Sequence, residues 1–268
     1  MAETRIPPIR IEPPLPGRAF ALYAQRLPGY EERLQQAVAT LQQAACAHAG
    51  RIVQASSLGA EDMVITDLIV RHRLPVAVAV IDTGRLHAET LALRQRAMAH
   101  WGIALEVWQP DTAEVRAFEA EHGADAMYRS PALRHACCGL RKVEPLRRLL
   151  AGRTAWITGL RREQSGQRAG VSLLDLDETG RAKVNPLADW RWADVWHYLQ
   201  THGVPYNPLH DAFMPSIGCA PCTRPIAVGE DFRAGRWWWE DDPRRECGLH
   251  LSGAAATPLP LSVAESQP

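Results

Sequence analysis

The 268-residue sequence predicts an α/β protein with a doubly wound, mostly parallel sheet. Three observations support this fold class. Apolar strand patterns alternate with helical patterns along most of the chain. Residues 76–81 are almost continuously apolar, as a parallel strand covered on both faces requires. Polar turns that contain glycine follow several strand patterns, at the position where open α/β sheets bind ligands.

Each element follows from a local pattern. Helical periodicity predicts helices over residues 30–49, 61–71, 87–101, 113–122, 135–150 and 190–201. Short apolar runs predict strands over residues 51–57, 76–81, 103–108 and 154–158, and then a hairpin over residues 171–176 and 181–185. Gly50 is expected to end the first helix, Pro145 to kink the fifth, and Gly180 to turn the hairpin.

Composition and patterning divide the chain into three expected parts. Residues 1–17 carry five prolines and little periodicity, which predicts a loose N-terminal arm. Residues 18–227 form the α/β domain, and residues 228–268 form a C-terminal tail. The N-terminus has no secretory pattern, no apolar run is long enough to cross a membrane, and the six cysteines are too clustered for a disulfide scaffold. We therefore expect a cytoplasmic protein with no membrane partner.

Charge is unevenly distributed although the net charge is zero. Residues 129–168 contain ten Lys or Arg against two Glu, a local excess of +8. This pattern favours a pocket for a small anion over a nucleic-acid surface. For the pair Arg147 and Arg148 alone, a solvated helix face is an equally good interpretation.

Three turns are candidate ligand-binding loops. The first opens a helix, whose N-terminus can bind an anion, and it lacks Walker spacing and a lysine. We expect the three turns to converge on one nucleotide-like ligand, with arginine at its anionic part. An ordinary surface turn is the alternative for each. The candidate residues are Ser56, Ser57, Gly59, Asp82, Thr83, Gly84 and Arg161.

Four cysteines carry a stronger signal. Cys137 and Cys138 are adjacent, and Cys219 and Cys222 form a Cys-x-x-Cys, so that four thiolates could hold an iron–sulfur cluster or zinc. Adjacent side chains on a helix point about 100° apart, which suits a broad 4Fe–4S cluster better than one zinc ion. Free buried thiols are the third interpretation. Lys142, about one turn past the pair, could lie between such a centre and an anionic ligand.

A further cysteine, Cys247, stands apart near the C-terminus and is a candidate nucleophile. Positive neighbours lower the pKa of a thiol and raise its thiolate fraction, although Glu246 opposes them. Three tryptophans at 237–239 are interpreted as a latch that docks the tail over the site. The nearby cations and the candidate acid–base group are Arg233, Arg236, Arg244, Arg245 and His250.

Together these residues resemble the assimilatory adenylyl-sulfate (APS) reductases, within the larger APS/PAPS reductase family. The similarity spans roughly residues 50–251. Residues 56–62 resemble the family's modified pyrophosphate loop, residues 81–84 its Asp-Thr-Gly turn, and residues 159–165 its substrate loop. Residues 246–250 resemble its catalytic Glu-Cys-Gly-Leu-His. The four cysteines resemble the cluster set of the APS-preferring branch.

The resemblance implies an adenine nucleotide α-hydrolase-like fold, one 4Fe–4S cluster per chain, and thioredoxin or a glutaredoxin-like protein as reductant. It implies reduction of adenosine 5′-phosphosulfate to sulfite and AMP through an S-sulfocysteine at Cys247, in sulfate assimilation toward cysteine. His250 would position or activate the thiol, and Arg161, Arg233 and Arg236 would hold phosphate and sulfate oxygens. A homo-oligomer is also expected.

Three alternatives stay open. The first is a PAPS reductase with the same mechanism. The second is a tRNA-thiolating enzyme, but it should carry an ATP-type loop and a broad basic surface, and neither is evident in the sequence. The third is a nucleotide-responsive iron–sulfur sensor, in which Cys247 would be idle.

Overall fold

A six-stranded sheet forms the centre of the computed structural model, which describes residues 16–227 and 229–240. The strand order is β3-β2-β1-β4-β6-β5, and β5 runs antiparallel to β6 whereas the other neighbours are parallel. This arrangement confirms the predicted fold class. The strands are β1 (Ile52–Ser56), β2 (Ala77–Ile81), β3 (Glu106–Trp108), β4 (Ala155–Ile157), β5 (Leu174–Leu176) and β6 (Ala182–Val184).

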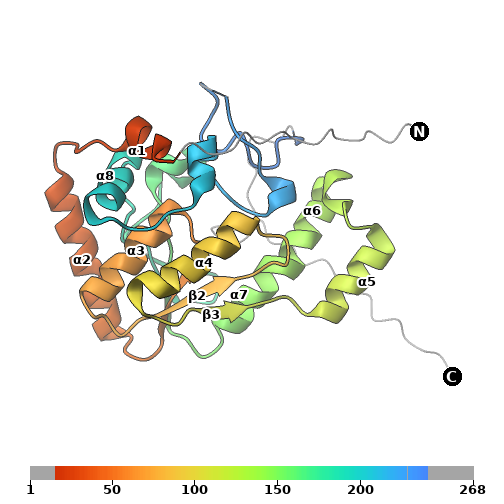
Figure 1. Ribbon diagram of the computed structural model, residues 1–268. Coiled ribbons are helices and arrows are strands. Elements are labelled where there is room, and N and C mark those ends of the chain that lie inside the picture. The colour runs from red at the N-terminus through yellow and green to blue at the C-terminus, as the bar shows by residue number, and fades with distance from the viewer. Residues whose placement is uncertain (1–15, 228, 241–268) are drawn as a thin grey trace.

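Helices cover both faces of this sheet (Figure 1). Ile52 of β1 belongs to a core shared with α2, α3, α4 and α8. Its neighbour Val53 packs on the opposite face, with Leu146 and Leu149 of α7. Two covered faces explain why the central strands β2 and β4 are apolar without alternation. The helices are α1 (Arg18–Tyr23), α2 (Tyr30–Ala47), α3 (Ala60–Arg71), α4 (Ala88–Trp101), α5 (Thr112–His122), α6 (Pro131–Cys138), α7 (Glu144–Leu149) and α8 (Trp192–His202).

Most predicted elements are present, with shifted ends. α2 ends at Ala47 with His48 as its C-cap, earlier than predicted, and Gly50 lies in the turn that follows. Gly50 and Gly180 adopt positive φ angles of 72° and 76°, which suits a turn after a helix and a hairpin turn. β3 is shorter than predicted because it is an edge strand that pairs with β2 over three residues. α6 begins earlier than residue 135 because the Ser130 side chain accepts a hydrogen bond from the Leu133 N–H and Pro131 suits the first turn.

The helix that carries the adjacent cysteines is distorted just before Pro145, where a kink is predicted. Between α6 and α7 lies a π-helical segment, η2 (Gly139–Val143), in which the Glu144 N–H donates to the Gly139 carbonyl five residues back. Pro145 has no N–H to donate to the preceding turn, and the wider π turn accommodates this loss. The cysteine pair therefore lies where the helix changes pitch.

Strand order places a topological switch point beside β1. The chain passes from β1 to β2 and β3 on one side, and β4 then pairs with β1 on the other side. Loops that follow strands on either side of such a point diverge and leave a crevice for ligands. No helix in the described part of the chain is long and apolar enough to cross a membrane.

Candidate active site

The loops that follow β1, β2 and β4 line one cavity of about 200 Å³ at the switch point. The three turns therefore meet, as the sequence predicts. Apolar side chains of β1, β2, β4 and α7 also face the cavity, so that it combines an apolar surface with polar loops. The loop residues are Ser56, Ser57, Gly59, Thr83, Thr158, Gly159, Leu160 and Gln164, and the cationic residues are Lys142, Arg168, Arg233 and Arg236.

Asp62 stabilises the loop after β1 and lies close against the loop after β4. Its carboxylate accepts hydrogen bonds from the Ser57 N–H at 2.6 Å and the Ser57 hydroxyl at 2.7 Å. A Cβ at position 159 would lie 2.7 Å from Asp62 Oδ1, so Gly159 is required for this close approach. Burial raises the pKa of Asp62 to about 6, although the hydrogen bonds from Ser57 oppose the rise.

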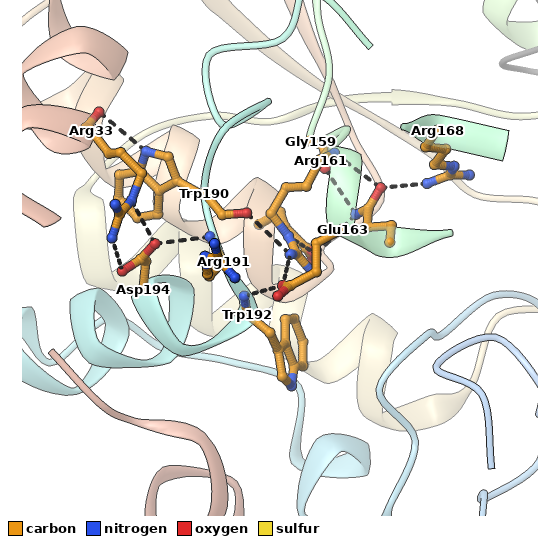
Figure 2. Close-up of polar contacts among 11 residues, drawn as sticks. Arg33, Gly159, Arg161, Glu163, Arg168, Trp190, Arg191, Trp192 and Asp194 are labelled. Atoms are coloured by element: carbon orange, nitrogen blue, oxygen red, sulfur yellow. Dashed lines mark hydrogen bonds and ion pairs between the residues drawn. The ribbon is translucent and has the colours of Figure 1, made fainter. Parts of the chain in front are cut away.

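Arg161 lies behind the cavity, fully buried, and does not line it. Its Nε donates to Glu61 Oε1 and its Nη1 to Glu163 Oε2, both at 2.8 Å, as Figure 2 shows in part. The guanidinium also lies 5.3 Å from the ring centre of Trp192. Through these contacts Arg161 holds the first turn of α3 in place. Arg168, in the same loop, lines the cavity instead.

Glu61 is the partner of Arg161 in this buried ion pair. Burial alone would raise the pKa of its carboxyl, but the Arg161 charge and the Gln164 amide outweigh burial and lower it. Gln164 Nε2 donates to Glu61 Oε1 at 2.9 Å. The acidic residue at the start of α3 is therefore neutralised locally by Arg161 and Gln164.

A second cavity next to the first is lined by all four predicted cysteines. Cys137 and Cys138 come from the end of α6, and Cys219 precedes the short 3-10 helix η6 (Ala220–Cys222), whose last residue is Cys222. The Thr83 hydroxyl lies 3.2 Å from Cys219 Sγ. The structure thus brings together residues that are more than 80 positions apart in the sequence.

Four cysteine side chains line this cavity and could together hold an inorganic centre. No three His, Cys, Asp or Glu side chains within residues 16–227 and 229–240 are arranged to hold one metal ion. A cluster has iron at several corners and accepts four thiolates spread around a wider centre. Arg85, Arg134 and Arg141 also line the cavity and would balance the negative charge of thiolates.

Lys142 and Trp237 line both cavities. Lys142 comes from η2, immediately after the cysteine pair. Burial would raise the pKa of the Cys219 thiol, but the Lys142 charge and the Thr83 hydroxyl outweigh it, and the pKa is lowered. The sequence predicts Lys142 between an inorganic centre and an anionic ligand; the structure places it in the lining of both cavities, and its role between two bound groups stays a prediction.

Other predicted residues lie elsewhere. Asp82 and Gly84 do not line the cavity, because the Asp82 carboxylate accepts the Gly84 N–H at 3.0 Å and shapes its own turn. Cys247 and His250 lie outside the described residues. Arg168 was not predicted, although it lies in the basic stretch 129–168 and in the loop after β4.

His210 also lines the first cavity and was not predicted from the sequence. Its Nδ1 lies 2.8 Å from the Met214 carbonyl oxygen, which can only accept, so Nδ1 carries the proton. Burial lowers the pKa of His210 to about 4, and the ring is therefore neutral near pH 7. No sequence pattern around a lone histidine indicates this burial.

The strand order and the helices on both faces of the sheet define a doubly wound, mostly parallel α/β protein. The fold of a Candida glabrata FMN adenylyltransferase is similar, with a TM-score of 0.52 at 12% identity over 75% of this chain and 67% of that chain. A family model described as the phosphoadenosine phosphosulfate reductase domain matches residues 51–225, and the chain belongs to this family.

Individual relatives are similar over most of their length. An adenosine 5′-phosphosulfate reductase of Allochromatium vinosum is 52% identical over 206 residues, which are 76% of this chain and 80% of the relative. One from Burkholderia cepacia is 51% identical over 78% of this chain and 83% of the relative. The crystal structure of a Candida auris phosphoadenylyl-sulfate reductase, a phosphate complex, has a TM-score of 0.60 at 26% identity and covers 74% of this chain and 98% of that chain.

Proposed function

We propose that the protein is an enzyme that reduces adenosine 5′-phosphosulfate to sulfite and AMP, with thioredoxin or a similar dithiol protein as reductant, in sulfate assimilation toward cysteine. The observation that carries the proposal is the pair of adjoining cavities, one lined by loops at the switch point and one by four cysteines, with Lys142 in both. Relatives that are 48–52% identical bear the name of this activity.

The substrate would bind with its anionic end on the polar loops. The N-terminus of α3 has no side-chain cap and follows Ser56, Ser57 and Gly59, a combination that favours an anion. The adenine would lie against the apolar part of the cavity. The cations proposed to hold the phosphate and sulfate oxygens are Lys142, Arg168, Arg233 and Arg236, with Arg161 supporting the loop from behind.

The proposed reaction begins at Cys247. Its thiolate attacks the sulfur of the substrate, an S–S bond forms, and the S–O bond to AMP breaks with the electron pair leaving on the phosphate oxygen. A thioredoxin thiolate then attacks Cys247 Sγ and displaces sulfite. The second thioredoxin thiol resolves the mixed disulfide and returns Cys247 to its thiol form. His250 would orient or activate the thiol in the first step.

Cys137, Cys138, Cys219 and Cys222 would hold a 4Fe–4S cluster. When bound, the cluster would supply a fixed charge distribution beside the substrate rather than electrons. Lys142 would place its ammonium between the cysteines and the sulfate, and its positive charge would couple the two electrostatically.

A PAPS reductase is the second candidate, favoured by the similarity to the Candida auris structure. The test is steady-state sulfite formation by the anaerobically purified protein with reduced thioredoxin, with APS and PAPS compared at equal concentration. A kcat/KM at least tenfold higher for APS supports the proposal. A higher kcat/KM for PAPS would overturn the substrate, and no sulfite from either would overturn the reaction.

A further inference from the structure

A buried ion pair joins the cysteine-bearing helix α6 to the end of the described chain. Arg134 donates from Nε to Glu240 Oε1 at 2.7 Å and from Nη2 to Glu240 Oε2 at 2.9 Å. The two side chains are 3% and 4% exposed and belong to residues 106 positions apart. Buried ion pairs contribute little net stability, and the best-attested reason to retain one is that it specifies a geometry.

The same guanidinium contacts the cysteine cavity. Arg134 lines that cavity, hydrogen-bonds to the Cys138 side chain and lies 4.7 Å from the ring centre of Trp237. Trp237 is 1% exposed and lines both cavities. The Arg134 side chain thus contacts Cys138, which is a predicted cluster ligand. It also contacts Trp237, which lines both cavities, and Glu240.

The segment that leads to Glu240 is also held by the other half of the cysteine set. The Arg236 Nε and the Trp237 N–H donate to the Cys222 carbonyl at 3.3 and 3.4 Å. Residues 236–240 therefore contact the Cys-x-x-Cys loop at one end and α6 at the other. Their position depends on how these two cysteine-bearing parts lie relative to each other.

Glu240 precedes Cys247 by seven residues, which span at most about 25 Å when fully extended. Fixing Glu240 therefore limits the volume that the Cα of Cys247 can reach to that radius around Glu240. An anchor at Glu240 is thus an anchor for the nucleophile.

We propose that the Arg134–Glu240 pair is a positioning device that fixes the start of the tail carrying Cys247 to α6, so that delivery of the nucleophile depends on the assembled four-cysteine cavity. This proposal rests on the proposed function for the role of Cys247, but the contacts that define the anchor do not. Glu240 and Arg134 act through Cys247 and need not touch the substrate.

The test compares Glu240→Gln and Arg134→Lys with the wild-type holoprotein. Glutamine keeps the size of Glu240 and loses its charge, whereas lysine keeps the charge and loses the two-point contact. We expect the single-turnover rate of Cys247 sulfonation to fall at least tenfold in Glu240→Gln, while the Kd for APS and the iron content change less than twofold. Glu240→Asp should recover part of the rate.

Glu230→Gln is the matched control, because it breaks a two-point pair with Arg224 at 2.8 Å in the same part of the chain, at 24% and 33% exposure. Its sulfonation rate should equal that of the wild type. Hydrogen exchange gives a readout independent of activity, since Glu240→Gln should increase exchange in peptides covering residues 131–138 and 236–240. Unchanged rate and exchange in Glu240→Gln would overturn the anchor. If wild-type protein formed no adduct, the proposed function would fail and exchange alone would decide on the anchor.

Discussion

Replacement of Arg161 by methionine tests how the loop after β1 is held. Methionine fills similar space but removes the guanidinium that donates to Glu61 and Glu163, both at 2.8 Å. The Glu61 side chain is 10% exposed and would keep the Gln164 amide at 2.9 Å. The variant therefore leaves a buried carboxylate without its charged partner.

The expected cost follows from these contacts. Two charge-assisted hydrogen bonds contribute roughly 1.5–3 kcal/mol each, and removal of one partner of a buried ion pair costs about 3–5 kcal/mol. We expect the free energy of unfolding to fall by about 3–5 kcal/mol in Arg161→Met. The double variant Arg161→Met/Glu61→Gln removes the orphaned charge and should lose less than about 2 kcal/mol.

Urea unfolding of the anaerobic holoprotein, followed by far-ultraviolet circular dichroism, measures both values through the transition midpoint and slope. Arg153→Met is the control, because its pair with Glu106 is 21% and 38% exposed and should contribute less than about 1 kcal/mol. A loss in Arg161→Met no larger than in Arg153→Met would refute the reasoning. So would a double variant that is less stable than the single one.

Three further predictions concern pH, metal content and rate. Because burial raises the pKa of Asp62 to about 6, the folded protein keeps a proton that the unfolded chain has released, and this group lowers stability by up to about 3 kcal/mol as pH rises from 4 to 6. His210, whose pKa burial lowers to about 4, has the opposite effect, with stability lost by up to about 3 kcal/mol as pH falls from 6.5 to 4. Urea unfolding from pH 4 to 7 measures the free energy of unfolding of each variant minus that of the wild type. This difference should rise with pH in Asp62→Asn and fall with pH in His210→Gln. Differences that do not change with pH would contradict both assignments. Cys222→Ser should lose at least half of the bound iron and sulfide by chemical analysis, whereas Cys46→Ser, at an exposed position, should lose none; full iron in Cys222→Ser would exclude it as a ligand. Lys142→Met should keep its iron but reduce the single-turnover rate with APS at least tenfold, and an unchanged rate would remove Lys142 from the proposed site.

Local patterns were sufficient for most of the fold. Glycine at 50 and 180 marks two turns and proline at 145 a helix distortion, through backbone geometry that does not depend on distant partners. The predicted length of β3 was wrong, because this edge strand has a single neighbour and pairs with β2 over three residues only. That limit is set by tertiary contacts, which no local pattern contains.

In the candidate site, too, some features could be predicted from the sequence and others depend on tertiary contacts. Convergence of the three turns follows from parallel strands alone, since their carboxyl ends meet at one edge. Parallel strands alone do not determine which arginine of the loop after β4 faces the cavity. Arg161 points away from the cavity because it pairs with Glu61, a residue 100 positions away. Asp62 and His210 owe their altered pKa values to burial by other elements, and a sequence read alone cannot identify that burial.

The most direct test of the central claim is a single turnover of the anaerobic holoprotein with APS in the absence of thioredoxin, analysed by intact mass and peptide mapping. The account predicts one sulfo group on Cys247, AMP released in equal amount, and sulfite released only when reduced thioredoxin is added. Cys247→Ser should bind APS and iron as the wild type does but form no adduct. An adduct on the Cys247→Ser variant, or none on wild-type protein with full iron content, would contradict the account.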